Sequence, residues 1–148
     1  MRNKLNKGQS LFEVMFALSV AAMILVAVVA LVATSIRNST FSKNKALANK
    51  YASELSEWLK KERNNGWNSF SQQLGTTDSN WCMVDLLWTG QKHSCAASDF
   101  ITSTIFKRQM DVTAGTNSYE FSITVTWSDG LGDHETKSTT VLTDWNQQ

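Results

Sequence analysis

The sequence of 148 residues has no proline and only two histidines. Without proline there can be no proline kink, so we expect any long helix to run comparatively straight. Neither His93 nor His134 lies in a recognised nucleophile or metal motif. The sequence also lacks a phosphate-binding glycine loop and a zinc-protease motif. These absences argue against an enzyme, and no cofactor is expected.

A basic excess that could bind nucleic acid is missing as well. The chain has 14 Lys and Arg against 13 Asp and Glu, a formal charge of +1. Three of the basic residues are Arg2, Lys4 and Lys7, and without them 11 basic side chains remain against 13 acidic ones. A charge near −2 provides no basic stripe, so we expect no nucleic-acid partner.

Charge is absent over one long apolar segment. From Val14 to Ile36 there is no charged residue, and about 20 apolar residues are enough to span a bilayer as a helix. A secretory signal would have a shorter apolar region of about 7–15 residues, although Val28-Val29-Ala30 would pass as its cleavage site. Glu13 precedes the segment directly, and a carboxylate there is costly in lipid without a partner. The position of Glu13 therefore predicts that this residue has a functional role.

The stretch Lys7-Gly8-Gln9-Ser10-Leu11-Phe12-Glu13 and the apolar run after it resemble the cleavage and methylation signal of type IV prepilins. The resemblance implies that residues 1–8 are a leader peptide, which the prepilin peptidase removes after Gly8. It also implies N-methylation of the new amine on Gln9. In that family the fifth mature residue is glutamate, here Glu13, and we expect its carboxylate to pair with the N-terminus of a neighbouring subunit. Gln9 departs from the phenylalanine or methionine that usually begins the mature chain.

The resemblance implies a structural subunit, a minor pilin or pseudopilin of a type IV pilus-like filament. Such a subunit starts as a single-pass precursor in the inner (cytoplasmic) membrane and ends in an extracytoplasmic or surface filament. Its partners would be other pilin subunits, the prepilin peptidase, the membrane, and the inner-membrane assembly platform with its ATPase. Pilus, DNA-uptake and type II secretion systems share this N-terminal signal. The alternative is a single-pass, membrane-anchored extracytoplasmic binding or adhesion protein, which needs neither cleavage at Gly8 nor an intact Glu13.

Glu13 also has a purely structural interpretation. Ser10-Leu11-Phe12-Glu13 fits the capping-box pattern, in which the two polar side chains satisfy free backbone donors at the start of a helix. A carboxylate there is further stabilised by the helix dipole.

Helical spacing continues beyond the apolar segment. Apolar residues recur at steps of three and four, the pattern of an amphipathic helix: Leu47, Tyr51, Leu55, Trp58 and Leu59. We therefore expect one helix from about Ser10 to Arg63, transmembrane over residues 9–36 and amphipathic over residues 37–66. Asn64-Asn65-Gly66 would end it, with Gly66 in a left-handed position. Tyr51, Trp58 and Trp67 are interpreted as packing residues.

Residues 67–148 are expected to form a β-rich head. Tyr119 to Trp127 alternates apolar and polar residues, the pattern of a half-buried strand. Weaker strands are expected over Ile101 to Val112 and His134 to Thr143, and Met83 to Trp88 suggests a short one. Adjacent strands with short connections form an antiparallel meander whose apolar face needs a helical cover. The predicted fold is α+β and pilin-like: a long N-terminal helix packed on a small antiparallel sheet.

Two smaller features remain open. If the head lies outside the cytoplasm, a disulfide between Cys82 and Cys95 is expected, with two free thiols as the alternative because sequence does not establish their geometry. His93 and these cysteines lack a fourth ligand at suitable spacing, so no metal site is expected. Asp129 and Asp133 flank glycines and could contribute to calcium binding, but two carboxylates are well short of a ligand set. Turn formation is the favoured role of Asp129 and Asp133.

Overall fold

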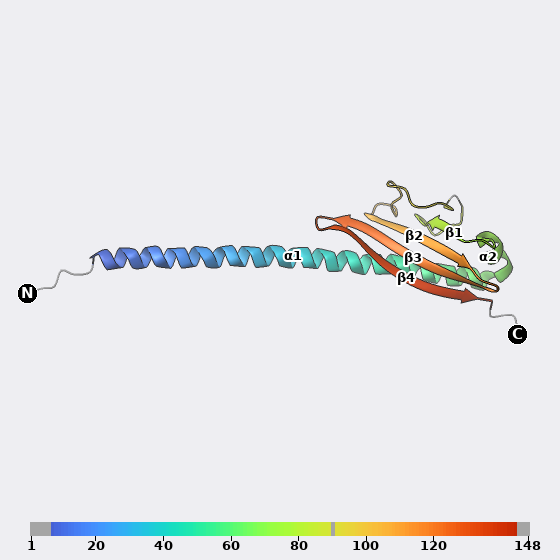
Figure 1. Cartoon of the computed structure of the whole chain (residues 1–148), viewed down its shortest axis with the longest axis horizontal. Helices are drawn as coiled ribbons and strands as arrows, with labels where there is room; N and C mark the ends of the chain where they lie inside the picture. Colours follow the sequence, from blue (N-terminus) through green and yellow to red (C-terminus); the bar gives the residue numbers. More distant parts are fainter. Residues whose placement is uncertain (1–6, 90, 145–148) are drawn as a thin grey trace, which may run out of the picture. The chain divides into compact units, whose positions relative to one another are not determined.

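The structure is a computed structural model that describes residues 7–89 and 91–144, with side chains from Leu11 onward. Two helices are followed by four strands in an α+β arrangement (Figure 1). The elements are α1 (Lys7–Asn65), α2 (Trp67–Leu74), β1 (Ser79–Cys82), β2 (Phe106–Ala114), β3 (Ser118–Asp129) and β4 (Gly132–Thr143).

The chain divides into two compact units, residues 1–42 and residues 43–148. The first unit contains the apolar part of α1. The second unit, called the head unit from here on, contains the remainder of α1, α2 and the sheet.

The predicted long helix is confirmed, with α1 extending a few residues beyond both expected ends. Between Gln9 and Asn65 there is neither glycine nor proline to interrupt it. Gly66 ends α1, but the left-handed conformation expected there is wrong, since its φ is 158° and its ψ is 118°. The carbonyl of Gly66 accepts a hydrogen bond from Phe70 N–H at 3.1 Å. This contact starts α2, so Gly66 joins two helices instead of ending one.

The sheet is antiparallel with strand order β1-β2-β3-β4. In this register Met110, in the middle of β2, is paired with Trp81 of β1 and with Ile123 of β3. The predicted alternation in β3 is confirmed by the burial of every second side chain. The buried set is Tyr119, Phe121, Ile123, Val125 and Trp127.

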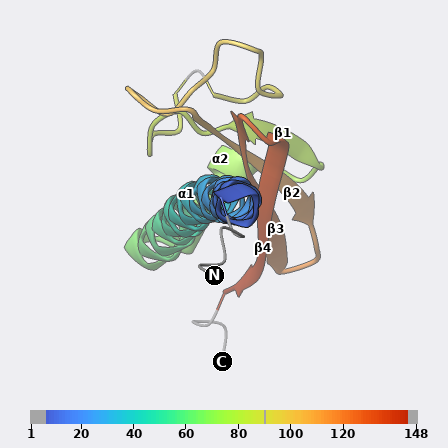
Figure 2. The same ribbon diagram turned by 90° about the vertical axis from the view of Figure 1, so that its left-hand side faces the viewer.

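The core of the head unit lies between the sheet and the helices. In Figures 1 and 2 the strands form one layer, and α2 and the head-unit part of α1 lie along one face of it. Four α1 side chains are buried on this side: Ala48, Ala52, Leu55 and Leu59. The Tyr51 ring lies 5.3 Å from that of Phe106, and the Trp58 ring 4.6 Å from that of Trp88. Tyr51 and Trp58 therefore pack as the sequence predicted, as does Trp67 of α2, whose ring lies 5.7 Å from that of Tyr119.

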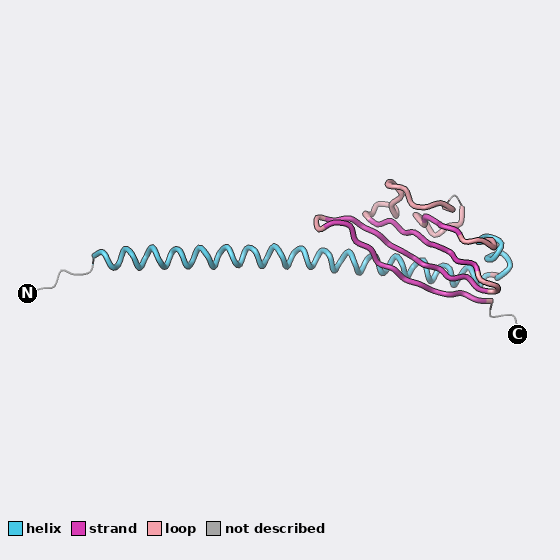
Figure 3. Tube along the Cα trace, in the orientation of Figure 1, coloured by secondary structure: helices cyan, strands magenta, loops and turns pink. Residues whose placement is uncertain are grey.

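The part of the head unit between α2 and β2 departs most from expectation. No strand forms over Met83 to Trp88, and β1 lies just before this segment. The strand expected from Ile101 begins only at Phe106, because Thr104 N–H donates to Ile101 O at 3.0 Å and closes a turn. Helix α2 was not predicted. Residues 83–105, residue 90 aside, are loops and turns (Figure 3).

Candidate functional site

The first unit presents an apolar surface along α1. Every described residue from Leu11 to Thr40 is exposed, including Phe12 at 75% and Val26 at 71%. This helix is long and apolar enough to cross a membrane. Ser19 and Thr34 donate their hydroxyl hydrogens to the carbonyls of Met15 and Ala30, at 2.9 and 3.0 Å. Because the helix itself satisfies these hydroxyls, the segment suits an apolar environment.

Glu13 is the only ionisable residue between Leu11 and Ile36, and its side chain is exposed. The backbone of Gly8 and Gln9 is part of α1, while the side chain of Gln9 lies outside the described part. Ser10 lies inside α1, so it cannot be its N-cap and the capping-box interpretation is wrong. Glu13 therefore presents an exposed carboxylate beside an apolar helix surface.

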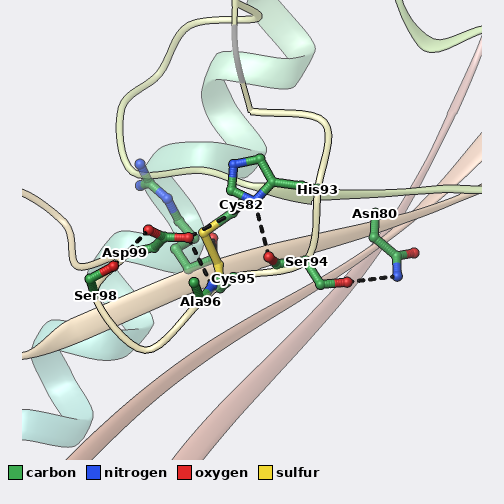
Figure 4. Close-up of polar contacts among 9 residues, drawn as sticks. Asn80, Cys82, His93, Ser94, Cys95, Ala96, Ser98 and Asp99 are labelled. Atoms are coloured by element: carbon green, nitrogen blue, oxygen red, sulfur yellow. Dashed lines mark hydrogen bonds and ion pairs between the residues drawn. A yellow bond between two sulfur atoms is a disulfide. The ribbon is translucent and has the colours of Figure 1, made fainter.

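A disulfide joins Cys82, at the end of β1, to Cys95 in the following loop, with the two Cα atoms 4.8 Å apart. Cys82 is fully buried, and its N–H donates to Gln91 O at 2.8 Å. Figure 4 shows the polar contacts beside the bridge. Asp99 accepts a hydrogen bond from Ala96 N–H at 2.8 Å, and the His93 ring nitrogen lies 3.0 Å from Ser94 O. These local contacts fix the loop and do not form a nucleophile–base pair.

The disulfide leads to a mass-spectrometric prediction. The full chain alkylated without reductant should keep its mass, and after reduction under denaturing conditions it should gain two adducts, one on Cys82 and one on Cys95. A Cys82→Ser/Cys95→Ser double variant serves as the control and should gain none under either condition. Labelling of both cysteines in the native, unreduced chain would contradict the bridge.

Arg108 is a buried cation that sequence reasoning missed. It lies in β2, 3% exposed, and donates from Nε to Met83 O at 3.0 Å and from Nη1 to Tyr51 O at 3.1 Å. Burial lowers the pKa of Arg108, whereas the carboxylates of Glu54 and Asp85 raise it. Arginine stays charged in proteins despite such shifts. Its guanidinium therefore connects the loop after β1 to α1, a structural role.

The turn between β3 and β4 is organised by Asp129. Its Oδ1 accepts a hydrogen bond from Leu131 N–H at 2.9 Å and lies 3.0 Å from His134 Nε2. The hydrogen bond from Leu131 N–H is the main cause that lowers the pKa of Asp129. Side-chain hydrogen bonds from His134 and Asn44 lower it further. Asp129 therefore holds a tight turn, the role favoured from the sequence.

We expect Asp129 to make the stability of the head unit depend on pH. Its native pKa lies below the ordinary value of 3.8, so the unfolded chain binds more protons between these two values. The carboxylate therefore stabilises the fold above about pH 3.8, and this contribution is lost as the pH falls through the native pKa. Urea unfolding of the full chain in detergent should show a smaller acid-induced loss of stability for Asp129→Asn than for wild type. Asp133→Asn in the same turn is the matched control, and equal pH dependence of wild type and Asp129→Asn would contradict the prediction.

A pocket of about 750 Å³ lies at the hairpin end of the sheet. It is lined by the loop before β2, the start of β2, the end of β3 and the start of β4. Its residues are Phe100, Thr104, Ile105, Lys107, Thr126, Trp127, Ser128, Asp133, His134 and Glu135. Lys107 Nζ lies 5.0 Å from the centre of the Phe100 ring. This volume is within the range of ligand sites, although polar and charged side chains outnumber the apolar ones, Phe100, Ile105 and Trp127.

Within the described residues, no group of three or more His, Cys, Asp or Glu side chains is placed to hold a metal ion. Comparison with models of protein families, with curated proteins and with solved structures found nothing that matches this chain. Its function is therefore inferred from its own residues and their geometry.

Proposed function

We propose that this chain is a structural subunit, a minor pilin or pseudopilin, of a type IV pilus-like filament. The supporting observation is the continuous exposed apolar surface of α1 with Glu13 as its single ionisable residue between Leu11 and Ile36. Apolar surface of this extent is covered by lipid or by other protein. A lone carboxylate beside it requires a cationic partner in the same environment.

Proteolytic processing would supply that partner. Cleavage after Gly8 creates an α-amine on Gln9, four residues before Glu13. The amine of one subunit then pairs with the Glu13 carboxylate of its neighbour, while the apolar surfaces of the two helices pack together. Removing one member of a buried ion pair costs about 3–5 kcal/mol. The pair therefore selects one axial register between neighbouring helices, and a fixed register repeated along a row of subunits gives a filament.

The head unit supports an extracytoplasmic location. Disulfides form and persist mainly in oxidising compartments outside the cytoplasm, and Cys82 is bonded to Cys95. In this orientation the basic residues before Gly8 remain on the cytoplasmic side, the apolar part of α1 crosses the membrane, and the head unit lies outside. The prepilin peptidase, the assembly platform and its ATPase would act on the chain, and the chain itself catalyses no reaction.

The proposal is tested by fractionating the cells that produce the chain. An epitope-tagged chain should appear in filaments sheared from the cell surface, and it should be absent from that fraction in a strain whose prepilin peptidase is catalytically inactive. The membrane fraction of both strains is the control for synthesis. Equal amounts of the chain in the membrane of both strains, with none in either sheared fraction, would contradict a role in a surface filament. That result would favour the anchored binding protein, for which the pocket of the head unit provides a site.

A further inference from the structure

Two stretches of the sequence carry opposite charge. From Val14 to Ser53 the chain has four basic residues and no acidic one. From Gln109 to Thr136 it has five acidic residues and no Lys or Arg. The basic residues are Arg37, Lys43, Lys45 and Lys50, and the acidic residues are Asp111, Glu120, Asp129, Asp133 and Glu135. Complementary charges of this kind steer association and fix its register.

The acidic stretch forms part of the pocket at the hairpin end of the sheet. Asp133 and Glu135 line it, and both are exposed. Phe100 and Ile105 line it too and are 41% and 46% exposed, so the pocket offers apolar surface beside its carboxylates. Lys107 adds one ammonium group, which is held over the Phe100 ring. A long basic side chain fits this combination, because its aliphatic stem packs on apolar surface while its charged end meets a carboxylate.

Only some of these charges are paired within the described part of a single chain, and Asp129 is one of them, with His134 Nε2 3.0 Å from its Oδ1. Lys50 forms an ion pair with Glu54 at 3.6 Å. Arg37, Lys43 and Lys45 form none there, and neither do Asp133 and Glu135. Lys43 and Lys45 are exposed on α1. These basic side chains of α1 and the two carboxylates of the pocket are therefore available to bind another molecule.

We propose that the pocket of one copy receives the basic stretch Arg37–Lys45 of a second copy. Glu135 and Asp133 would accept hydrogen bonds from its ammonium or guanidinium groups, and Phe100 and Ile105 would cover the aliphatic stems. This inference rests on the proposed function, because a filament brings copies together in one repeated register. It adds a head-to-helix contact to the helix-to-helix contact made through Glu13.

Photo-crosslinking of the full chain in cells that assemble the filament tests both contacts separately. One copy carries a photoreactive phenylalanine analogue at Ser128, which lines the pocket and is exposed. A second version carries it at Val20, in the apolar part of α1. Adducts to a differently tagged copy are isolated and mapped by mass spectrometry. We expect Ser128 adducts on the peptide that contains Arg37–Lys45, and Val20 adducts on the apolar segment of the second copy.

Each result decides a different point. Val20 adducts without Ser128 adducts, or Ser128 adducts on another segment, would overturn the pocket contact and leave the filament proposal standing. The absence of adducts from both positions would overturn the filament proposal and this inference together. Ser128 adducts only to a different protein would show that the pocket binds a foreign ligand, and would also overturn the inference.

A charge exchange distinguishes a specific contact from mere proximity. Asp133→Lys/Glu135→Lys in the pocket copy should lower the Ser128 adduct yield about tenfold, because like charges would then face each other. Arg37→Glu/Lys43→Glu/Lys45→Glu in the second copy should restore it. Protection of Cys82 and Cys95 from alkylation verifies that each variant is folded. Failure of the reversed partner to restore the yield in folded variants would contradict the contact.

Discussion

Glu13→Ala should reduce the amount of this chain in sheared filaments roughly 100- to 4,000-fold while its amount in the membrane stays unchanged. The magnitude follows from the cost of leaving one partner of a buried ion pair alone, about 3–5 kcal/mol, at about 1.4 kcal/mol for each tenfold change. Membrane insertion should be unaffected, because the substitution removes the one charge between Leu11 and Ile36. The measurement is quantitative immunoblotting of membrane and sheared fractions.

Two further variants test whether the charge of Glu13 is what filament assembly requires. Glu13→Gln keeps the shape of the side chain but not its charge, so it should be excluded from filaments nearly as strongly as Glu13→Ala. Ser19→Ala is the matched control within the same segment, because the Ser19 hydroxyl is already bonded to Met15 O of its own helix. Ser19→Ala should enter filaments normally. Normal incorporation of Glu13→Ala would remove the carboxylate from the assembly mechanism.

Arg108→Met should lower the free energy of unfolding of the head unit by about 4 kcal/mol. The guanidinium donates to Met83 O and Tyr51 O, carbonyl groups on two different segments of the chain. A buried polar group that loses its partner costs about 1–3 kcal/mol, and two such groups are left here. Methionine fills much of the same space, so the loss reflects mainly the missing donors. Urea unfolding of the full chain in detergent, followed by tryptophan fluorescence, measures it.

The neighbouring Lys107 provides the comparison for Arg108. Its side chain lies in the pocket over the Phe100 ring, a cation–π contact worth about 0.5–1 kcal/mol at exposed sites. Lys107→Met should therefore cost less than about 1 kcal/mol. Arg108→Lys should fall between the two methionine variants, since a single ammonium group cannot reproduce the planar fork of the guanidinium. A loss for Arg108→Met no larger than that for Lys107→Met would show that Arg108 does not connect the loop to α1.

The sequence predicted those parts of the fold that depend on local pattern. The course of α1 beyond Gly8 follows from an uninterrupted run without glycine or proline, and β3 follows from the strict alternation between Tyr119 and Trp127. The loops from Met83 to Ile105 could not be predicted in the same way. They are held by contacts between residues that lie far apart in the sequence, such as the Cys82–Cys95 bridge and the Arg108–Met83 hydrogen bond. Helix α2 has only eight residues, and the polar composition of the segment concealed its two buried residues, Phe70 and Leu74.

The candidate sites also differ in whether the sequence alone could reveal them. Glu13 was found from sequence because a single carboxylate beside a long apolar segment is visible without a structure. Arg108 could have been found, since it occupies a position in phase with Phe106, Met110 and Val112, all buried in β2. The pocket could not, because it joins Phe100 and Ile105 from a loop to Glu135 at the far end of the β3–β4 turn. Only the pairing of β2, β3 and β4 brings these residues together.

N-terminal mass spectrometry of the chain after co-expression with a prepilin peptidase tests the proposed function most directly. A catalytically inactive peptidase is the control. We expect a mature chain that begins at Gln9, with or without a methyl group on its amine, only when the peptidase is active. An intact Met1, or a chain that starts after Ala30, with either peptidase would contradict the proposed processing and filament role. It would leave an anchored or secreted protein in which Glu13 has no role in assembly.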